Sequence, residues 1–285
     1  MHSATVTASL LATLPLLAQA WNAPTYPGFN LVWQEAFAGA AGTSPSTSTW
    51  NIITGYLGVN SELEVYSDSN ANLQLSGGDT LQIVPVEGND GSWTSARIES
   101  TYTFTPAAGV VTLAEADIRF GDNDVSHKEG LWPAFWMLGD SLRHGGTWPE
   151  SGEVDALETV DGKLTGYGTV HCDANPGGVC NEPTGIQGQT PIPDQSWHTW
   201  RVQFDRTSNN WQTETITWYL DGQQFFSVSG SQVNDENSWS ALCHSPLYFI
   251  LNVAVGGAWP GKPNSKTLDG FGSMMEVAYV AVYSS

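Results

Sequence analysis

Basic residues are scarce in this sequence. Nine Lys and Arg stand against 29 Asp and Glu among 285 residues, which gives a formal net charge of −20. Such a chain repels phosphate backbones and anionic lipid, so we expect neither nucleic-acid binding nor electrostatic docking on a membrane. Charged residues of both signs make up only 13 % of the chain, well below the roughly 25 % of typical soluble domains. Glu, Lys and Arg are therefore too few for a coiled coil.

Long hydrophobic runs are missing after residue 20. No later segment offers the ~18 consecutive apolar residues that a membrane-spanning helix needs. Residues 1–20 have the pattern of a secretory signal, because an apolar stretch at 10–17 precedes the small-x-small sequence Ala18-Gln19-Ala20. An ordinary buried N-terminal strand or helix is the alternative. The sequence thus predicts a secreted, extracellular mature chain of residues 21–285.

Cysteine is also rare, with three residues in the whole chain. Secretion permits a disulfide, and we predict a bridge between Cys172 and Cys180, which enclose a short loop, with Cys243 left as a buried thiol. The chain has no Cys-x-x-Cys or His-x-x-x-His spacing, so a zinc site is not expected. No Asn-x-Ser/Thr sequon is present, and N-glycosylation is not expected.

Aromatic and small residues are plentiful instead. The chain carries 13 Trp and 30 Gly, and 40 % of its residues are hydrophobic, a composition that supports a packed core and excludes disorder. We find no internal repeat. The polar segment 43–49 is too short to link two domains, so the sequence predicts one domain over residues 21–285.

Short runs of β-branched and aromatic residues recur along the chain, separated by Gly, Asn, Asp and Pro. No window of useful length shows a clean helical period. Asp221-Gly222 lies between two such runs, which is typical of a β-hairpin. This pattern predicts an all-β fold, an antiparallel sandwich or barrel. The predicted strands are 80–86, 109–112, 116–120, 166–171, 198–204, 215–220, 225–228, 247–255 and 274–283.

Three carboxylates stand within six residues in the segment Gly152-Glu-Val-Asp-Ala-Leu-Glu158. In a strand, Glu153 and Asp155 share one face while Val154 points into the core. Regular alternation would put Glu158 on the other face, and a β-bulge of one extra residue near 156–157 returns it to the side of Glu153. Two leaning Glu side chains then approach the ~5–5.5 Å carboxyl separation of a retaining glycosidase.

Carboxylates this close cannot all ionise freely. One is expected to hold its proton to higher pH, so one residue type supplies both a nucleophile and a general acid, with Asp155 orienting a neighbour. The alternative is a solvated strand face on a very acidic protein. Against that alternative stands the aromatic segment 131–138 (LWPAFWML), because flat rings cover the apolar faces of sugars.

The catalytic-type segment GEVDALE, together with GLWPAFWMLG, closely resembles family 16 of the glycoside hydrolases, and within it the laminarinase-type fungal endo-1,3(4)-β-glucanases. The likeness extends over nearly the whole mature chain. The resemblance implies a concanavalin-A-like β-jelly roll, a sandwich of two antiparallel sheets with a concave substrate cleft. Supporting segments are 31–37 (LVWQEAF), 95–98 (SARI), 168–171 (GTVH), 252–261 (NVAVGGAWPG) and 277–283.

The resemblance also implies roles for the carboxylates. Glu153 matches the nucleophile and Glu158 the acid/base of a retaining double displacement on β-glucan, and Asp155 matches a residue that assists Glu153. His171 would face Glu158 from the neighbouring strand; a satisfied surface histidine is its alternative. Since Glu158 must be protonated while Glu153 is charged, we expect an acidic pH optimum.

Further residues are expected in the cleft from the same resemblance. For each Trp, core packing is the alternative reading, and for Arg97 it is a surface ion pair. Glu62, beside Asn60, resembles a cleft-edge motif only weakly. The expected substrate-binding residues are Trp132, Trp136, Trp148, Trp259, Arg97, Asn252, His171 and Glu62.

The chain departs from the family pattern at one place. Many relatives bind a structural calcium between acidic residues of the first and last strands, but the matching positions here are Ala36 and Ala278. Calcium needs hard oxygen ligands, so we expect no calcium there, no other metal and no cofactor. The expected partner is a β-glucan, and the expected state is a monomer.

Two other functions use the same fold. A non-catalytic glucan-binding module has no need of a nucleophile and an acid at bulge spacing, which disfavours it. A transglycosylase would use the same residues, so the sequence does not separate it from a hydrolase. The sequence also leaves open the preference between β-1,3 and mixed β-1,3/1,4 linkages.

Overall fold

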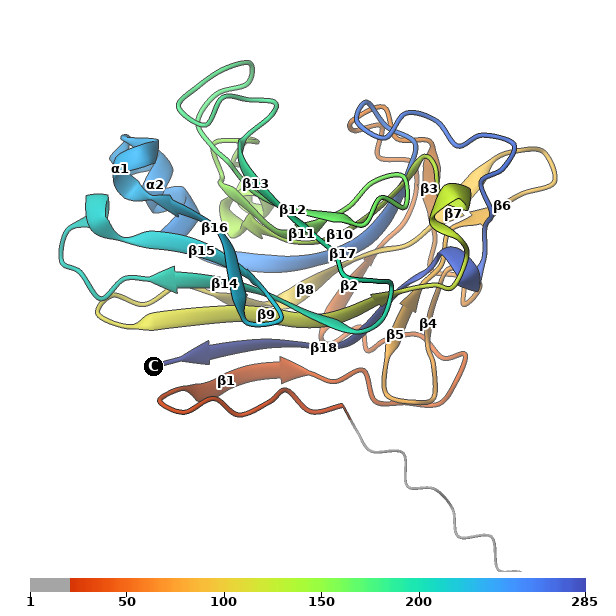
Figure 1. Ribbon diagram of the computed structural model, residues 1–285, viewed down its shortest axis with the longest axis horizontal. Helices are drawn as coiled ribbons and strands as arrows, with labels where there is room; N and C mark the ends of the chain where they lie inside the picture. The colour runs from red at the N-terminus through yellow and green to blue at the C-terminus, as the bar shows by residue number, and fades with distance from the viewer. Residues whose placement is uncertain (1–20) are drawn as a thin grey trace, which may run out of the picture.

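Two large antiparallel sheets pack face to face in the computed structural model, which describes residues 21–285 (Figure 1). The predicted signal segment, residues 1–20, lies outside the described residues. The all-β sandwich is the predicted fold class. We call the sheet with the hollow face the inner sheet; its strands are, in order, β13 (Ile186–Pro191), β12 (Thr165–His171), β11 (Glu153–Glu158), β10 (Leu131–Gly139), β17 (Leu247–Val255), β8 (Arg97–Phe104) and β2 (Trp50–Ile53).

The second sheet, which we call the outer sheet, packs against the face of the inner sheet opposite the hollow face. A small third sheet joins β3 (Glu64–Tyr66), β7 (Trp93–Ser95) and β6 (Val86–Glu87). The outer sheet contains, in order, β16 (Gln223–Ser229), β15 (Thr215–Leu220), β14 (His198–Asp205), β9 (Val111–Phe120), β18 (Met275–Ser284), β5 (Leu81–Ile83) and β4 (Leu73–Leu75), with β1 (Asn30–Glu35) paired to β18.

Strand periodicity explains how the core forms between the sheets. Along β14 buried and partly exposed residues alternate strictly, as expected for a strand with one face in the core. All nine residues of β17 are buried, because the core covers one face and side chains such as Trp136 pack over the other. The strands over 215–220 and 247–255 have the predicted bounds, and the two predicted runs at 109–112 and 116–120 join in the single strand β9.

Turns and helices complete the fold. The predicted hairpin joins β15 to β16, with Asp221 at φ 49° and Gly222 at φ 75°. The short helices α1 (Gly230–Val233) and α2 (Glu236–Cys243) were not predicted, since they are too short to show a period. Asp235 caps α2 by accepting a hydrogen bond from the Ser238 amide at 2.8 Å. Short 3₁₀ segments lie at Val125–His127, Asp140–His144, Trp211–Thr213 and Phe271–Ser273.

Two glycines let the sheets approach closely behind β11. A Cβ on Gly166 would stand 2.2 Å from the ring of Trp200, and a Cβ on Gly168 would stand 2.5 Å from the ring of Trp218. The indoles from the outer sheet therefore occupy the space that side chains on β12 would fill. Trp218 also donates from Nε1 to the main-chain oxygen of Asp155 at 2.6 Å, which holds β11 from the side of the outer sheet.

The predicted bulge in β11 is confirmed by the strand register. Opposite β10, Phe135 pairs with Leu157 while the next residue, Trp136, pairs with Asp155, so Ala156 is the extra residue. The same shift interrupts the pairing of β11 with β12 between Asp155 and Glu158. Glu158 is thereby returned to the face that carries Glu153 and Asp155.

The cysteines behave as predicted. Cys172 and Cys180 form a disulfide with Cα atoms 5.4 Å apart, and Cys243 is a buried free thiol. Within residues 21–285, no helix is long and apolar enough to span a membrane.

Candidate active site

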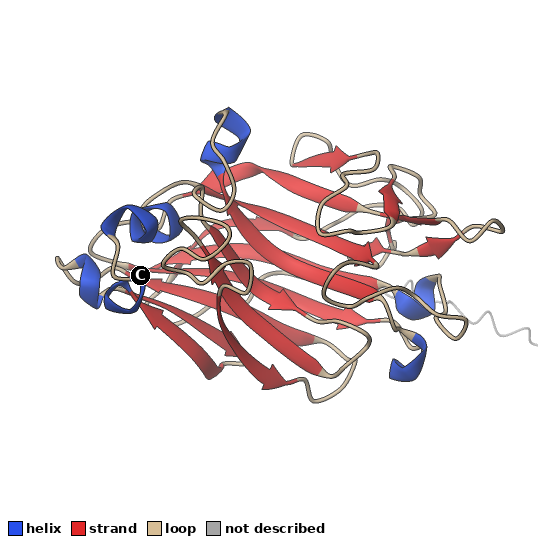
Figure 2. Cartoon of the chain, turned by 90° about the horizontal axis from the view of Figure 1, so that it is seen from above, coloured by secondary structure: helices blue, strands red, loops and turns tan. Residues whose placement is uncertain are grey.

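An open groove crosses the hollow face of the inner sheet. In Figure 2 the helices lie towards the periphery, at the ends of the strands, so none covers the middle of the sheet. Two cavities meet in this groove, and both are lined by Asn60, Trp132, Trp148, Glu153 and Glu158. The carboxylates therefore stand in the middle of a continuous groove rather than at a closed end.

The structure brings every residue predicted for the site into this groove. On one side of the carboxylates the wall contains Glu62, Arg97, Trp136 and Asn252. On the other side it contains His171 and Trp259, with Pro183 and Gln187. Whether each of them contacts a sugar stays a prediction.

Each of the two glutamates accepts a hydrogen bond from an indole. Trp148 donates from Nε1 to Oε2 of Glu153 at 2.9 Å, and Trp132 donates from Nε1 to Oε1 of Glu158 at 2.9 Å. Asp155 lies between them and is only 2 % exposed. The bulge and the two indoles thus aim a pair of carboxyl groups at one stretch of the groove.

Burial and mutual repulsion raise the pKa values of all three carboxyl groups. Burial raises the pKa of Glu158 to about 7, and the charge of Glu153 adds to this shift. Burial also raises the pKa of Glu153, but the charge of His171 and the N–H of Trp148 oppose the shift. The pKa of Asp155 is raised well above its usual value by burial and by the charge of Glu153. Asp155 therefore keeps its proton, and of the two glutamates Glu158 is the one that holds a proton near neutral pH while Glu153 is better placed to ionise.

His171 lies elsewhere than expected. In the register of β11 and β12 it pairs with Glu153, whereas Tyr167 pairs with Glu158, so the expectation that His171 faces Glu158 is wrong. Its Nε2 stands 3.5 Å from Oδ2 of Asp155 and 3.9 Å from Oε1 of Glu153. Four positions along β12 separate His171 from Tyr167, the residue that pairs with Glu158, and sequence alone does not fix strand register.

Hydrogen bonds also hold the side chains on the side of the groove away from His171. Trp136 donates from Nε1 to Asn252 at 2.8 Å, and Asn252 donates to the hydroxyl of Tyr66 at 3.1 Å. Arg97 pairs with Glu99 at 2.7 Å, so the ion pair given above as its alternative exists. Its guanidinium also lies 4.8 Å from the centre of the Trp136 ring and lines the groove. Burial raises the pKa of Glu62 to about 8, with Glu64 adding to the shift.

Sequence reasoning missed Glu182. This carboxylate accepts a hydrogen bond from the Cys172 amide at 2.8 Å and contacts Nδ1 of His171 at 2.6 Å. Its side chain is fully buried. The only signal in the sequence was an acidic residue two positions after a predicted disulfide cysteine. Tyr66 and Tyr167 were also missed, because aromatic residues in short strands look like core.

Two side-chain clusters have donor types that bind metals. In the first, atoms of Glu153, Asp155 and His171 lie within 4.8 Å of one another. The pKa of His171 is lowered by burial, but its hydrogen bond to Glu182 and the charges of Glu153, Glu182 and Glu158 outweigh this and raise it to about 9. An imidazolium already supplies the positive charge there and repels a cation.

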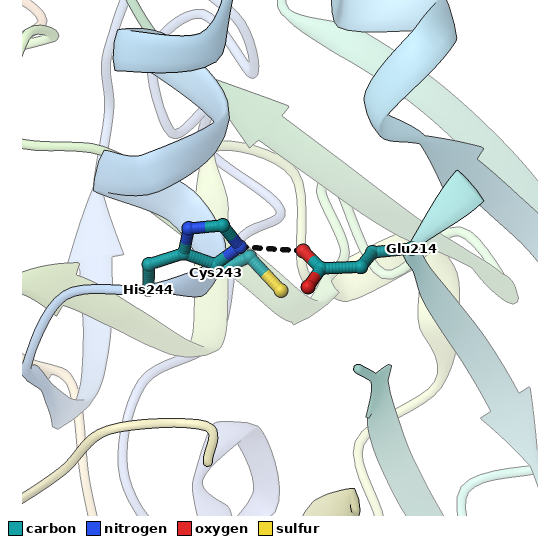
Figure 3. Close-up of side chains that lie close together, drawn as sticks. All are labelled: Glu214, Cys243 and His244. Carbon is teal, nitrogen blue, oxygen red and sulfur yellow. Dashed lines mark hydrogen bonds and ion pairs between the residues drawn. The ribbon is translucent and has the colours of Figure 1, made fainter. Parts of the chain in front are cut away.

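The second cluster is Glu214, Cys243 and His244, at the end of α2 (Figure 3). Both oxygens of Glu214 are taken: Trp239 and His244 donate to Oε2, and Arg206 donates to Oε1. Burial raises the pKa of the Cys243 thiol far above its usual range, so it stays protonated. These contacts fit an anchor that ties α2 to the start of β15. At the family's calcium position stand Ala36, partly buried, and Ala278, fully buried, and the expected lack of calcium there stays a prediction.

A family model and two known relatives agree on the family to which this chain is similar. The model described as "XgeA-like, catalytic GH16 domain" matches residues 60–230. Glucan endo-1,3-beta-glucosidase A1 of Niallia circulans is 30 % identical over 91 % of this chain, which spans 38 % of that protein's length. Beta-glucanase of Rhodothermus marinus is 30 % identical over 90 % of this chain, which spans 86 % of it.

A solved structure supports the same assignment. The crystal structure of endo-1,3-beta-glucanase from Streptomyces sioyaensis superposes with a TM-score of 0.86 and 36 % sequence identity. The superposition covers 92 % of this chain and 99 % of the other. The two sheets described above are thus an arrangement that both chains share.

Proposed function

Because this chain belongs to glycoside hydrolase family 16, we propose that it is a secreted, endo-acting β-1,3-glucanase that retains the anomeric configuration. The observation that carries the proposal is the position of Glu153 and Glu158. A bulge brings both carboxyl groups to one face of β11, in the middle of an open groove. The relatives named above as β-glucanases supply the substrate class.

The first chemical step joins enzyme and sugar. The carboxylate of Glu153 attacks the anomeric carbon and forms a C–O bond, while the bond from that carbon to the glycosidic oxygen breaks. Glu158 gives its proton to the departing oxygen. In the second step Glu158, now ionised, takes a proton from water, and the water oxygen displaces Glu153. Two inversions at one carbon give net retention.

The protonation states suit this sequence of steps. Glu158, with its pKa raised by burial to about 7, holds the required proton in mildly acidic solution. The N–H of Trp148 and the charge of His171 favour the ionised form of Glu153. Asp155, beside the bulge and between the two glutamates, keeps its proton and assists by orienting Glu153.

The groove supports cleavage inside a polymer. Since the carboxylates stand between two cavities, sugar units fit on both sides of the scissile bond. The indoles of Trp132, Trp148 and Trp259 offer apolar faces for pyranose rings, and Arg97, Asn252 and Glu62 offer hydrogen-bonding groups at one end. We propose these residues, with Trp136 and His171, as the substrate-binding set, on a monomer.

A substrate panel tests this function. Purified protein is incubated with laminarin, barley mixed-linkage glucan, lichenan and cellulose, and the products are sized. We expect laminarin to be cut into a range of oligosaccharides, and mixed-linkage glucan to be cut where a β-1,3 bond is present. Release of only mono- or disaccharide from the first minutes would contradict endo action, and products longer than an oligosaccharide substrate would indicate a transglycosylase.

The stereochemistry is read from the same reaction. Proton NMR during the first minutes of hydrolysis should show the β-anomer of the new reducing end before mutarotation. An initial α-anomer would mean inversion, which requires a wider carboxyl separation and a bound water.

A further inference from the structure

The buried carboxylate of Glu182 is not used by the chemistry above, yet it touches the site through one side chain. Its Oε2 lies 2.6 Å from Nδ1 of His171, and its Oε1 accepts the Cys172 amide at 2.8 Å. Glu182 does not line the groove. It contacts the site through the imidazole of His171, and its charge also adds, from farther away, to the raised pKa values of Glu153 and Asp155.

The loop that carries Glu182 holds it firmly. The disulfide between Cys172 and Cys180 closes the loop beside the end of β12. Gly177 and Glu182 exchange two main-chain hydrogen bonds, at 2.8 and 2.6 Å. With the Cys172 amide on its side chain, Glu182 is fixed at both its backbone and its carboxylate.

Every charged group that faces His171 is acidic. From β11 come Glu153, at 3.9 Å from Nε2, and the more distant Glu158, while the carboxyl group of Asp155, at 3.5 Å, holds its own proton. From the loop comes Glu182, the nearest of all. The ring of Trp148, neutral, lies 5.8 Å away, and Arg97 on β8 acts on Glu153 from the other side.

We propose that Glu182 is a positioning residue of this reaction, which holds the imidazole of His171 by Nδ1 and keeps it protonated, so that Nε2 stands as a cation beside Asp155 and Glu153. This inference rests on the proposed function. It assigns a task to the disulfide loop: the loop supplies the negative charge that places a proton on His171 instead of on the nucleophile.

The electrostatic sign follows from the distances. A proton shared between His171 and Glu153 lies on the histidine when the charge nearest to the histidine is negative, and Glu182 is much nearer to the histidine than to Glu153. Without that charge, burial favours neutral imidazole, and more of the shared proton moves to Glu153. Removal of one negative charge also lowers the total proton affinity of the coupled groups, which are His171 and the carboxyl groups of β11. The group that deprotonates next therefore does so at lower pH.

The test is Glu182→Gln, which keeps the size and an acceptor oxygen but removes the charge. On laminarin we expect kcat to fall several-fold with KM nearly unchanged, and the alkaline limb of kcat/KM to move to lower pH by about one unit, the shift usual for a charge at this distance. A structural role alone would lower the amount of folded enzyme without moving the limb.

The chain contains a matched control. Asp221 contacts Nδ1 of His198 at 2.7 Å and accepts the Thr199 amide at 2.9 Å, which is the arrangement of Glu182 with His171 and Cys172. His198 and Asp221 do not line the groove. Asp221→Asn should leave both limbs of the pH profile in place. If both variants shift the profile alike, the effect is general and the proposal is overturned.

A second readout does not depend on turnover. The imidazole of His171, identified by its loss in His171→Gln, is titrated by NMR in the wild type and in Glu182→Gln, with Glu182→Asp as the charged variant if Gln prevents folding. We expect the pKa of the His171 ring to be at least one unit lower in Glu182→Gln than in the wild type. In Glu182→Asp it should stay close to the wild-type value. Unchanged titration without the charge overturns the proposal. A wild type that is inactive on every glucan but shows the titration shift would overturn the proposed function alone.

Discussion

Single side chains decide which carboxyl group of the site carries a proton. The indole N–H groups of Trp148 and Trp132 each point at one glutamate, so both ionised forms receive a hydrogen bond. The two groups differ in their charged neighbours: His171 stands beside Glu153, whereas Glu158 feels chiefly burial and the charge of Glu153. The division of labour between two identical residue types therefore comes from their surroundings.

Replacement of the glutamates should separate the two roles. Glu153→Gln removes the proposed nucleophile, and we expect kcat on laminarin to fall by about 10³-fold or more. Glu158→Gln removes the proposed general acid, and we expect a loss of about 10²–10⁴-fold, smaller on aryl glycosides whose leaving group needs no proton. Exposed Glu150, on the preceding turn, is the control, and Glu150→Gln should keep wild-type rates. Substantial turnover by Glu153→Gln would assign the nucleophile elsewhere.

The indole of Trp148 should tune the acid limb. Trp148→Phe keeps an aromatic face but removes the N–H that stabilises ionised Glu153, so the pKa of Glu153 rises. We expect the acid limb of kcat/KM to move to higher pH by about half a unit. Trp259→Phe changes a groove ring outside these hydrogen bonds to the carboxylates and should leave the limb unmoved; a downward shift for Trp148→Phe would contradict the assignment.

Among the structural elements, the bulged strand β11 and the disulfide-closed loop after β12 together arrange the charged groups of the site. The bulge turns Glu158 to the groove, and the loop at the end of β12 brings Glu182 behind His171. Cys172→Ala with Cys180→Ala opens the loop, and we expect a loss of about 2–3 kcal/mol of unfolding free energy, measured by urea denaturation. The alkaline limb should move in the direction expected for Glu182→Gln. Cys243→Ala, a buried thiol outside any disulfide, should leave the pH profile unchanged.

Local patterns predicted the parts of the fold that local forces determine. The hairpin at Asp221-Gly222, the strand over 215–220, the disulfide and the bulge all follow from turn chemistry, alternation and spacing within a few residues. The neighbours of His171 and the role of Glu182 depend on how β11 aligns with β12 and on where a loop folds back. Such pairings join segments through the tertiary structure, and no pattern in either segment specifies them.

For the whole molecule, buried acids and one histidine make stability depend on pH. Glu158 and Glu62 titrate near 7 and 8 in the folded chain against 4.5 when exposed, so the folded state binds more protons above pH 4.5. His171 titrates near 9 against 6.5, and its contribution is complete below 6.5 and lost as the pH rises to 9. All three therefore reduce stability as pH increases from 4.5 to 9.

We expect the melting temperature to be highest near pH 5 and about 10 °C lower at pH 9. Below pH 4.5 the trend reverses, because carboxylates with lowered pKa values, such as Glu214 with its hydrogen bonds from His244 and Trp239, lose their charge. Calorimetry across this range checks the expectation. Added salt should weaken the part of the pH dependence that comes from repulsion among exposed charges, in a chain of formal net charge −20, and leave the part due to buried groups. A melting temperature that climbs from pH 5 to pH 9 would refute the sign.

The close contact behind β11 restricts how this enzyme can diverge. Gly166 and Gly168 have no room for a methyl group, because the rings of Trp200 and Trp218 fill that volume. Each glycine and the indole that faces it are therefore expected to change together. A side chain at either glycine position requires a smaller residue in place of the facing Trp, and loss of that Trp allows residues other than glycine. Paired substitutions at 166 with 200 and at 168 with 218 are the expected trace of this constraint among divergent descendants.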